Sequence, residues 1–495
     1  MLIQRIRAPA IVVSTIGCAL FLFYYLFIIE GTNVELSTVF LFLSGSLVFT
    51  DGVRWLRGEL EVFEPTGIFG CLGLFYFYIG PLLQQTWGYW PYLPDLSGSR
   101  VWLDLWSVCS FIGIILYKTM VSLSENSKSS SVISCVWLFH PQRFVFVMAL
   151  FLCISILAQG YVYYKFGGIS GFVETYTQRQ AEQLGMSTKD PFKGYGVVML
   201  VAESFKPLFA LCTIYYFKDF KITKTNVFLL AYLSACLIVF LVFGGLRGSR
   251  SNTVVSLFIA VGMYHLVIRQ ISMRVMVMFG FAALLFLFGY SAYKVGGISK
   301  MSTFLNGGLE TASSSETNRM IKYLVARDLC RQDVQTLAFR EFASGDLSHI
   351  WGRSYIYGIF SVVPAALVGD KPVQLTKEKS DMIHGKGAFV AGGPRQTTVT
   401  LGQPGEAFVN FGFLGYFGFF VVFGAFVGRI RSTFSSLSQQ DVRRYYLPII
   451  SYLLILMFFT DMNVIYMHCA RYLLFPASLL MFCLQVCKNE EALTT

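Results

Sequence analysis

Residues 404–427 read PGEAFVNFGFLGYFGFFVVFGAFV, and this stretch decides the class of fold. Only Glu406 is charged in this run, and a helix of roughly 17–25 mostly apolar residues is long enough to cross a bilayer. The whole chain shares this character. Of its 495 residues, 55% are hydrophobic and 14% are charged, whereas soluble domains have roughly 45–50% and about 25%. This composition excludes a soluble enzyme and a disordered chain, and it predicts an all-α polytopic membrane protein.

Eleven further apolar stretches have the length and composition of membrane-crossing helices. Together with 404–427 they give about twelve predicted transmembrane helices. The eleven lie at 8–29, 36–53, 66–84, 101–121, 143–164, 196–217, 226–243, 251–268, 275–293, 446–460 and 466–486. The first stretch lacks a cleavage site of small residues, so we expect a retained anchor and not a signal peptide.

Lys and Arg residues are distributed unevenly among the predicted connections. With the N-terminus inside, the cytoplasmic segments hold seventeen of them, and the short outer connections hold only Arg100, Arg247 and Arg250. An excess of Lys and Arg marks the cytoplasmic side, so we expect both termini in the cytoplasm. Much of the net charge of +11 therefore reflects topology and contact with anionic membrane lipids. A nucleic-acid partner is not expected.

The predicted spans divide the chain into three parts. Residues 1–293 hold nine helices and an outer loop at 165–195, residues 294–403 form a large extracytoplasmic loop, and residues 404–495 hold three helices and a cytoplasmic tail. A loop of this length is usually functional. Its part at 310–346 has a polar, mostly helical pattern. The stretch that begins GRSYIYGIFSVVPAALVGDKP at Gly352 is too short to span, and we expect it to be re-entrant or interfacial.

The large loop also carries an excess of positive charge, with 13 Lys and Arg residues against 9 Asp and Glu residues. Cys330 is alone in this loop, so the cysteines imply no disulfide framework. No cluster of His, Cys and carboxylate residues has metal-ligand spacing. We therefore expect neither a metal nor another cofactor.

The turn FGGLRGSRSNT at 243–253 is a candidate phosphate site. Glycines allow the backbone to turn and expose its N–H groups, the start of a helix favours an anion, and Arg247 and Arg250 can bind phosphate oxygens. The turn lacks the Lys-Ser/Thr ending of a nucleotide P-loop and is predicted to face outward. A lipid-linked diphosphate fits better than ATP. The alternative is a tight turn whose arginines extend toward lipid headgroups.

Several charged residues lie inside or at the ends of predicted spans, where charge is costly and usually functional. Glu203 and Lys206 are three residues apart and are expected to pair on one helix face. Arg471 lies in an otherwise apolar stretch and needs an anion, either Asp461 or a ligand phosphate. Glu406 stands where the last long span leaves the outer loop, and His384 lies in the loop sequence DMIHGKG.

The order of these features resembles the Wzy-type oligosaccharide repeat-unit polymerases of bacterial surface polysaccharides, over roughly residues 150–480. A G-G-x-R turn heads a helix, and the large outer loop follows with an aromatic-apolar run and a G-x-x-P step at 369–372. His384 stands beside a glycine, an N-F-G-x-x-G sequence opens a late span at 410–415, and Arg471 lies in the last helix. The second arginine of GGLRGSR departs from the pattern.

The resemblance implies a metal-independent membrane glycosyltransferase, similar to the GT-C class, at the outer face of the bacterial cytoplasmic (inner) membrane. Such an enzyme transfers a growing glycan from its undecaprenyl-diphosphate carrier to the sugar of a new lipid-linked unit. Its expected partners are the lipid-linked donor and acceptor, membrane lipids, a chain-length regulator and a flippase. The product would be O-antigen of lipopolysaccharide or another surface polysaccharide.

Residue roles follow from the chemistry of this transfer. The diphosphate is a good leaving group whose developing charge needs stabilisation, which we assign to Arg247 and Arg250. The acceptor hydroxyl needs a base, for which His384 is the first candidate and Glu406 the second. Tyr355 is a candidate sugar-stacking residue, as are Trp351 and Tyr357, unless these rings form an interfacial aromatic belt. Secondary substrate contacts are assigned to Arg353, Lys371, Lys386, Arg395, Arg471 and, as a possible partner of Arg471, Asp461.

Three other classes are also compatible with the sequence. An O-antigen-ligase-like transferase would use the same donor with a lipid A-core acceptor. A polyprenyl-phosphate-dependent GT-C transferase usually has adjacent acidic residues in its first outer loop, and the EGTNVE sequence at 30–35 lacks an Asp-x-Asp motif. A flippase or other transporter would place charges in two related halves, and no repeat relates 1–240 to 250–495.

Overall fold

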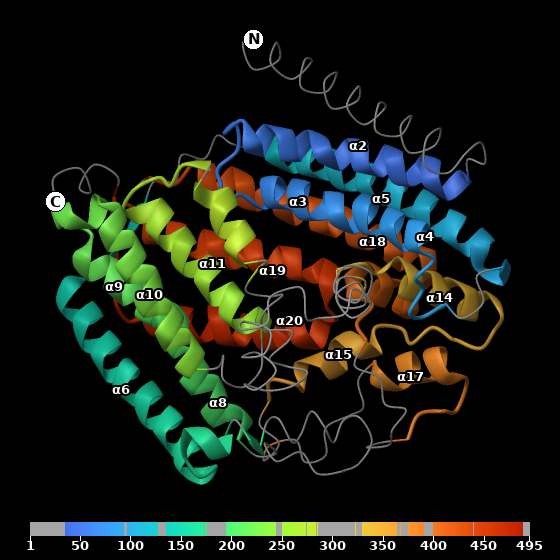
Figure 1. Ribbon diagram of the computed structural model, residues 1–495. Coiled ribbons are helices and arrows are strands. Elements are labelled where there is room, and N and C mark those ends of the chain that lie inside the picture. Colours follow the sequence, from blue (N-terminus) through green and yellow to red (C-terminus); the bar gives the residue numbers. More distant parts are fainter. Residues whose placement is uncertain are drawn as a thin grey trace, which may run out of the picture.

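A computed structural model gives the fold, which consists mainly of long helices with one small sheet (Figure 1). The described residues are 35–93, 97–126, 135–172, 174–175, 195–243, 250–273, 275–283, 285, 322, 329–363, 367, 375–390, 399–438 and 440–488.

The first two thirds of the chain form most of the helices. They are α2 (Leu36–Leu56), α3 (Pro65–Leu74), the π-helix η2 (Phe75–Ile79), α4 (Gly80–Trp87), α5 (Arg100–Asn126), α6 (Pro141–Lys165), α8 (Gly196–Glu203), α9 (Phe205–Phe217), α10 (Asn226–Val242) and α11 (Arg250–Val267). Short 3-10 turns lie at Ser97–Ser99 and Lys221–Lys224.

The remaining elements belong to the large loop and the last spans. They are α14 (Gln332–Ala343), α15 (Arg353–Ile359), α17 (Thr376–His384), α18 (Gly402–Ser435), the 3-10 helix η7 (Val442–Tyr446), α19 (Leu447–Phe459), α20 (Met462–His468), the π-helix η8 (Cys469–Leu474), α21 (Phe475–Met481), and the strands β1 (Cys135–Phe139) and β2 (Leu484–Lys488).

Eight helices of the described residues are long and apolar enough to cross a membrane, counting continuous runs such as α3–α4 and α20–α21 as one. Two shorter apolar helices, α10 and α11, lie beside them. The chain is therefore a polytopic, predominantly helical membrane protein. The expected span 8–29 lies outside the described residues and 275–293 is described only in part, so the number twelve remains a prediction, as does GT-C-like architecture.

The helices form two groups, with α19 and α20 between them (Figure 1). One group contains α2, α3, α5 and α18, and the other contains α6, α8, α9, α10 and α11. In the first group α18 lies along α5 because two glycines permit close approach. A Cβ at Gly424 would lie 2.5 Å from the Tyr117 carbonyl oxygen, and one at Gly428 would lie 2.6 Å from that of Val121. Small residues four apart are typical of such contacts in membranes.

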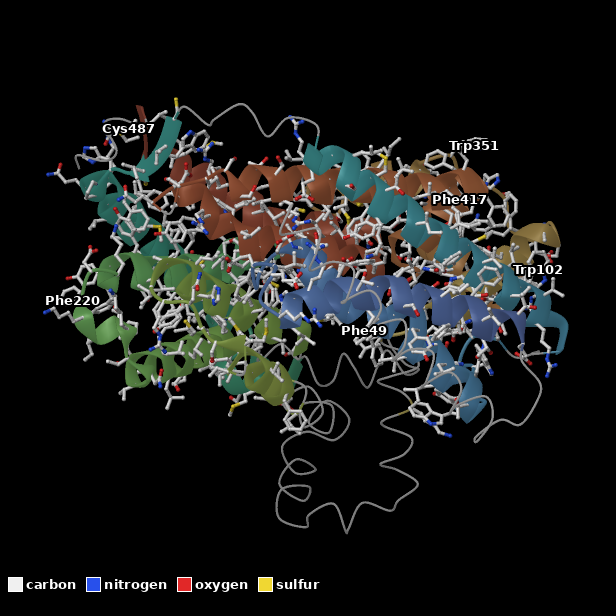
Figure 2. All side chains as sticks on the ribbon, turned by 90° about the horizontal axis from the view of Figure 1, so that it is seen from above. Phe49, Trp102, Phe220, Trp351, Phe417 and Cys487 are labelled. Atoms are coloured by element: carbon white, nitrogen blue, oxygen red, sulfur yellow. The ribbon has the colours of Figure 1, made fainter. Side chains whose placement is uncertain are left out.

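The connections predicted to be cytoplasmic contact one another at one end of the helices. Arg431 near the end of α18 forms ion pairs with Glu64 and with Glu125, the latter at 3.0 Å, and His265 lies 2.8 Å from Glu61. Figure 2 shows Phe220 and Cys487 at this end and Trp102 and Trp351 at the other. The inside-outside topology, including the side that faces the cytoplasm, remains a prediction.

The C-terminal part departs from the predicted span 466–486. The helix ends at Met481 and the chain continues as β2, which pairs antiparallel with β1, Cys135 lying opposite Lys488. The prediction was wrong here because apolar content alone does not distinguish a helix from a strand. The backbone groups of this segment pair with a strand that precedes α6, so the fold is not purely helical.

The described part of the large loop contributes three helices to the opposite end of the molecule. α14 is almost fully buried beside α5, and Gln335 binds Trp106 Nε1 at 2.7 Å and the Leu401 carbonyl oxygen at 2.6 Å. The helical pattern predicted within 310–346 is confirmed for 332–343. α15 packs on α20, since a Cβ at Gly358 would lie 3.1 Å from the Tyr466 ring. The loop is therefore packed into the ends of the spanning helices.

Candidate functional site

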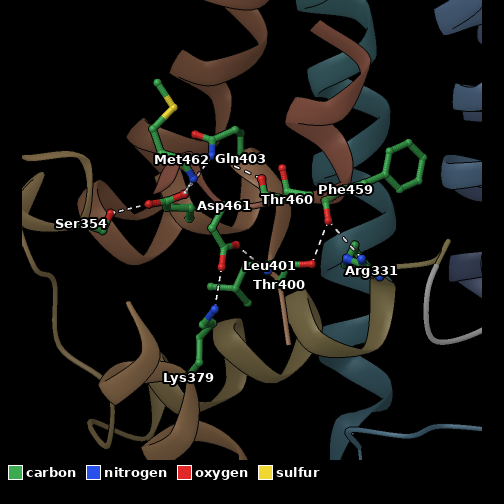
Figure 3. A network of polar contacts seen from close by, with 11 residues as sticks. Arg331, Ser354, Lys379, Thr400, Leu401, Gln403, Phe459, Thr460, Asp461 and Met462 are labelled. Carbon is green, nitrogen blue, oxygen red and sulfur yellow. Dashed lines mark hydrogen bonds and ion pairs between the residues drawn. The ribbon is translucent and has the colours of Figure 1, made fainter. Parts of the chain in front are cut away.

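The carboxylate of Glu406 is the centre of a buried polar network at the loop end of the helices. Figure 3 shows its partners Ser354, Gln403 and Met462. Glu406 lies in the first turns of α18 and is 1% exposed. Its Oε1 accepts a hydrogen bond from Ser354 Oγ at 2.6 Å, and its Oε2 accepts from Gln403 Nε2 at 2.8 Å and from the Met462 N–H at 2.6 Å. Three donors from three elements thus fix the position of this carboxylate.

A second buried carboxylate, Asp461, lies close enough to Glu406 for electrostatic interaction. Asp461 precedes α20 and is 2% exposed. Lys379 Nζ lies 2.6 Å from its Oδ2, and the Leu401 N–H donates to its Oδ1 at 2.8 Å. Two carboxylates and one ammonium group therefore meet here, and charges this deeply buried need such partners.

The local fold of α18 explains why the loop reaches this network. Gly412 has φ 65° and ψ −151°, a conformation that kinks the helix and is accessible almost only to glycine. The backbone carbonyl groups of Val409 and Asn410 accept hydrogen bonds from Ile350 and Trp351 at 3.3 and 3.1 Å. The kink thus frees carbonyl groups that anchor the segment leading into α15.

Tyr355 of α15 lies close enough to the two carboxylates for electrostatic interaction. Its ring stacks on Phe411, with 6.3 Å between centroids. Burial raises the pKa of the Tyr355 hydroxyl well above its usual range, and the Glu406 and Asp461 carboxylates raise it further. The Tyr355 hydroxyl group therefore keeps its proton at neutral pH. Arg353, two residues earlier, forms an ion pair with Glu378 of α17 and lies 6.0 Å from the Tyr357 ring centre.

Apart from Arg471, the predicted site residues fall into three groups. Glu406, Asp461 and Tyr355 are brought together, and Arg353 lies on the same helix as Tyr355, α15. His384 is the exposed last residue of α17, five residues after Lys379, and Lys386 is exposed in the turn that follows. Arg247, Lys371 and Arg395 lie outside the described residues, as does the side chain of Arg250, whose backbone begins α11.

Arg471 has a partner that the sequence did not predict. Its Nε lies 2.7 Å from Glu203 Oε2, whereas Asp461 binds Lys379. Asp461, one of the two alternative partners predicted for Arg471, therefore does not pair with it, because the turn at Asp461 faces the loop helix α17 and η8 faces α8. Glu203 ends α8 and Lys206 lies in α9, so the helix is interrupted at Ser204 between them.

Sequence reasoning missed Ser354, Lys379 and Gln403. Ser354 and Lys379 are 52 and 82 residues from the carboxylates that they contact. The only local signal was Gln403, three residues before Glu406 at the start of a span. No group of three or more His, Cys, Asp or Glu residues that could hold a metal ion occurs among the described residues. Independence from metals stays a prediction.

No protein-family model matches the chain, and no curated protein or solved structure is significantly similar to it. The likeness to polysaccharide polymerases therefore rests on the order of the sequence motifs alone.

Proposed function

We propose that the protein is a membrane glycosyltransferase that polymerises undecaprenyl-diphosphate-linked oligosaccharide repeat units at the outer face of the bacterial cytoplasmic membrane. The observation that carries this proposal is the buried Glu406–Asp461 pair near Tyr355, at the end of the spanning helices where the large loop packs. A fixed carboxylate at the membrane surface is suited to accept a proton from a sugar hydroxyl that reaches it from a lipid carrier.

In this proposal Glu406 is the general base and Asp461, held by Lys379, orients the network. The three donors to Glu406 define the direction from which a hydroxyl group can approach. Tyr355 donates a hydrogen bond to the acceptor sugar. His384, at the exposed end of α17, is the second candidate base, and the pair of arginines at 247 and 250 is assigned to the departing diphosphate.

The deciding experiment uses the purified full-length protein with a synthetic undecaprenyl-diphosphate-linked repeat unit. A ladder of lengthened products is expected, and Glu406→Gln should abolish it. Arg247→Ala should also abolish long products without lowering protein abundance. An unchanged length of the polysaccharide products in the Arg247 variant would refute the assignment of Arg247 to the diphosphate. A normal ladder of products from Glu406→Gln would show that Glu406 is not the general base and would favour His384.

The same preparation separates the neighbouring classes. Transfer of glycan only to a lipid A-core acceptor, without lengthening, would show a ligase. Movement of the lipid-linked unit across a liposome bilayer without any new glycosidic bond would show a transporter. Either result would contradict the proposed polymerase.

A further inference from the structure

A second buried polar cluster lies within the spanning helices. Its charged members are Lys206 in α9, which is 0% exposed, Arg471 in η8, which is 8% exposed, and Glu203 at the end of α8, which is 3% exposed. Charged side chains inside membrane spans are costly and usually mark a binding or transport site. The π-helical turn that carries Arg471 is also a feature common at functional sites.

Contacts between the three helices fix this cluster. Arg471 Nε lies 2.7 Å from Glu203 Oε2, and Ser204 Oγ donates to the Arg471 carbonyl oxygen at 3.3 Å. Lys206 Nζ lies 5.7 Å from the centre of the Tyr472 ring. The helix is interrupted at Ser204, so Glu203 ends α8 and Lys206 lies in α9. The two cations, Lys206 and Arg471, and the Glu203 carboxylate thereby come together beside Tyr472.

The first turns of α11 border the same cluster. The Ser256 and Tyr472 hydroxyl groups lie 3.4 Å apart. Thr253, one turn earlier on the same face, is 1% exposed, and its hydroxyl has no hydrogen-bond partner among the described residues. The start of a helix carries partial positive charge, so α11 adds to the field of Lys206 and Arg471.

We propose that Lys206 and Arg471 bind the phosphate groups of a lipid-linked substrate inside the membrane, with Thr253 and Ser256 as hydroxyl donors. Two cations, a helix start and two hydroxyl groups match the acceptor oxygens and the negative charge of a phosphate. Because the cluster lies between apolar helices, the phosphate must arrive on a lipid. The identity of that lipid rests on the proposed function.

The position of the cluster explains how such a substrate would reach the carboxylates. Arg471 follows Asp461 by ten residues along α20 and η8, which is about 15 Å at 1.5 Å per residue. One continuous helical run therefore carries the proposed phosphate site at one point and the carboxylate site at the other. A sugar attached to the phosphate would lie between them.

The test is a titration of purified full-length protein, in nanodiscs of zwitterionic lipid, with farnesyl diphosphate as the probe. Lys206→Met replaces a buried ammonium group with an apolar side chain of similar length, so the variant should fold. We expect about tenfold weaker binding, or more, from loss of a charge-assisted contact. The double variant Glu203→Gln/Arg471→Gln removes both charges of the ion pair together and should weaken binding similarly.

The matched control is Lys118→Met, which also removes a lysine from a spanning helix but at the opposite end, where Lys118 lies 2.9 Å from Asp51. It should bind the probe as the wild type does. Farnesol, which lacks the diphosphate, should bind far more weakly.

Three results would overturn the proposal: unchanged binding by Lys206→Met, equal binding of farnesol, or equal competition by phosphatidylglycerol. None of these readouts requires catalysis. If the wild type binds the probe through Lys206 but forms no polymer, the phosphate site stands and the proposed function fails. If polymer forms while Lys206→Met binds the probe normally, the proposed function stands and the phosphate site fails.

Discussion

The ammonium group of Lys379 lies 2.6 Å from the carboxylate of Asp461, and both side chains are buried. This ion pair joins α17 of the large loop to the turn between α19 and α20. Asp461 also accepts the Leu401 N–H, so one carboxylate connects the loop, the start of α18 and the last spans. The loop is therefore attached to the spanning helices at the candidate site itself.

Lys379→Met should destabilise the protein strongly because it leaves the Asp461 carboxylate buried without its cation. Removing one member of a buried ion pair costs about 3–5 kcal/mol. Thermal unfolding of the purified protein measures the change.

The double variant Lys379→Met/Asp461→Asn provides the control, since it removes both charges. It should recover a large part of the lost stability. If its loss equals the sum of the two single losses, the two side chains are not coupled and the ion pair is not what holds the loop.

Glu406→Gln should reduce polymerisation by about 10²-fold or more if this carboxylate is the general base. The fold should persist, since an amide oxygen can still accept from Met462 and Gln403 while the amide nitrogen donates to the Ser354 hydroxyl. The measurement is the rate of ladder formation together with the unfolding temperature.

Glu341→Gln is the matched control. Glu341 forms an ion pair with Arg340 at 2.9 Å at the end of α14 and belongs to the same loop. Its variant should polymerise normally. An equal loss in both variants would indicate a general effect of charge on the loop and not a base at Glu406.

The spanning helices could be predicted because hydropathy alone determines them. α6 and α18 begin at Pro141 and Gly402 and include the predicted stretches 143–164 and 404–427. The predicted end at 486 failed where Leu484–Lys488 pairs with another strand, because a long-range backbone contact overrode an apolar pattern.

Half of the carboxylate site could be predicted and the other half could not. Glu406 was visible as the single charge in an apolar run, and Asp461 as a charge in a short turn. Ser354 and Lys379 were not, since nothing local marks a loop residue that docks on a distant helix. The i,i+3 spacing of Glu203 and Lys206 likewise gave no sign of the break at Ser204 or of Arg471 as a partner.

Gly412→Ala should destabilise the protein by about 1–3 kcal/mol, because the backbone conformation at the kink is strained for any side chain. A Cβ there would also lie 2.9 Å from His349 Cε1. Gly418→Ala in the same helix is the control, since a Cβ at Gly418 meets nothing within 4 Å, and it should be neutral or stabilising. Equal unfolding temperatures for both variants would show that the kink does not require glycine.

Asp333 should make stability fall as pH rises from about 4 to 6. Asp333 is fully buried at the start of α14, and burial raises its pKa from 3.8 to about 6, although the Val334 N–H and Arg331 oppose the shift. Between these two values the folded protein binds more protons than the unfolded chain, so ionisation favours unfolding, by up to about 3 kcal/mol above pH 6.

Asp333→Asn removes this titration while its amide oxygen can still accept from Val334. The variant should therefore unfold at a higher temperature than the wild type at pH 7, but not at pH 4. A constant difference between the two proteins across this range would show that Asp333 does not titrate there.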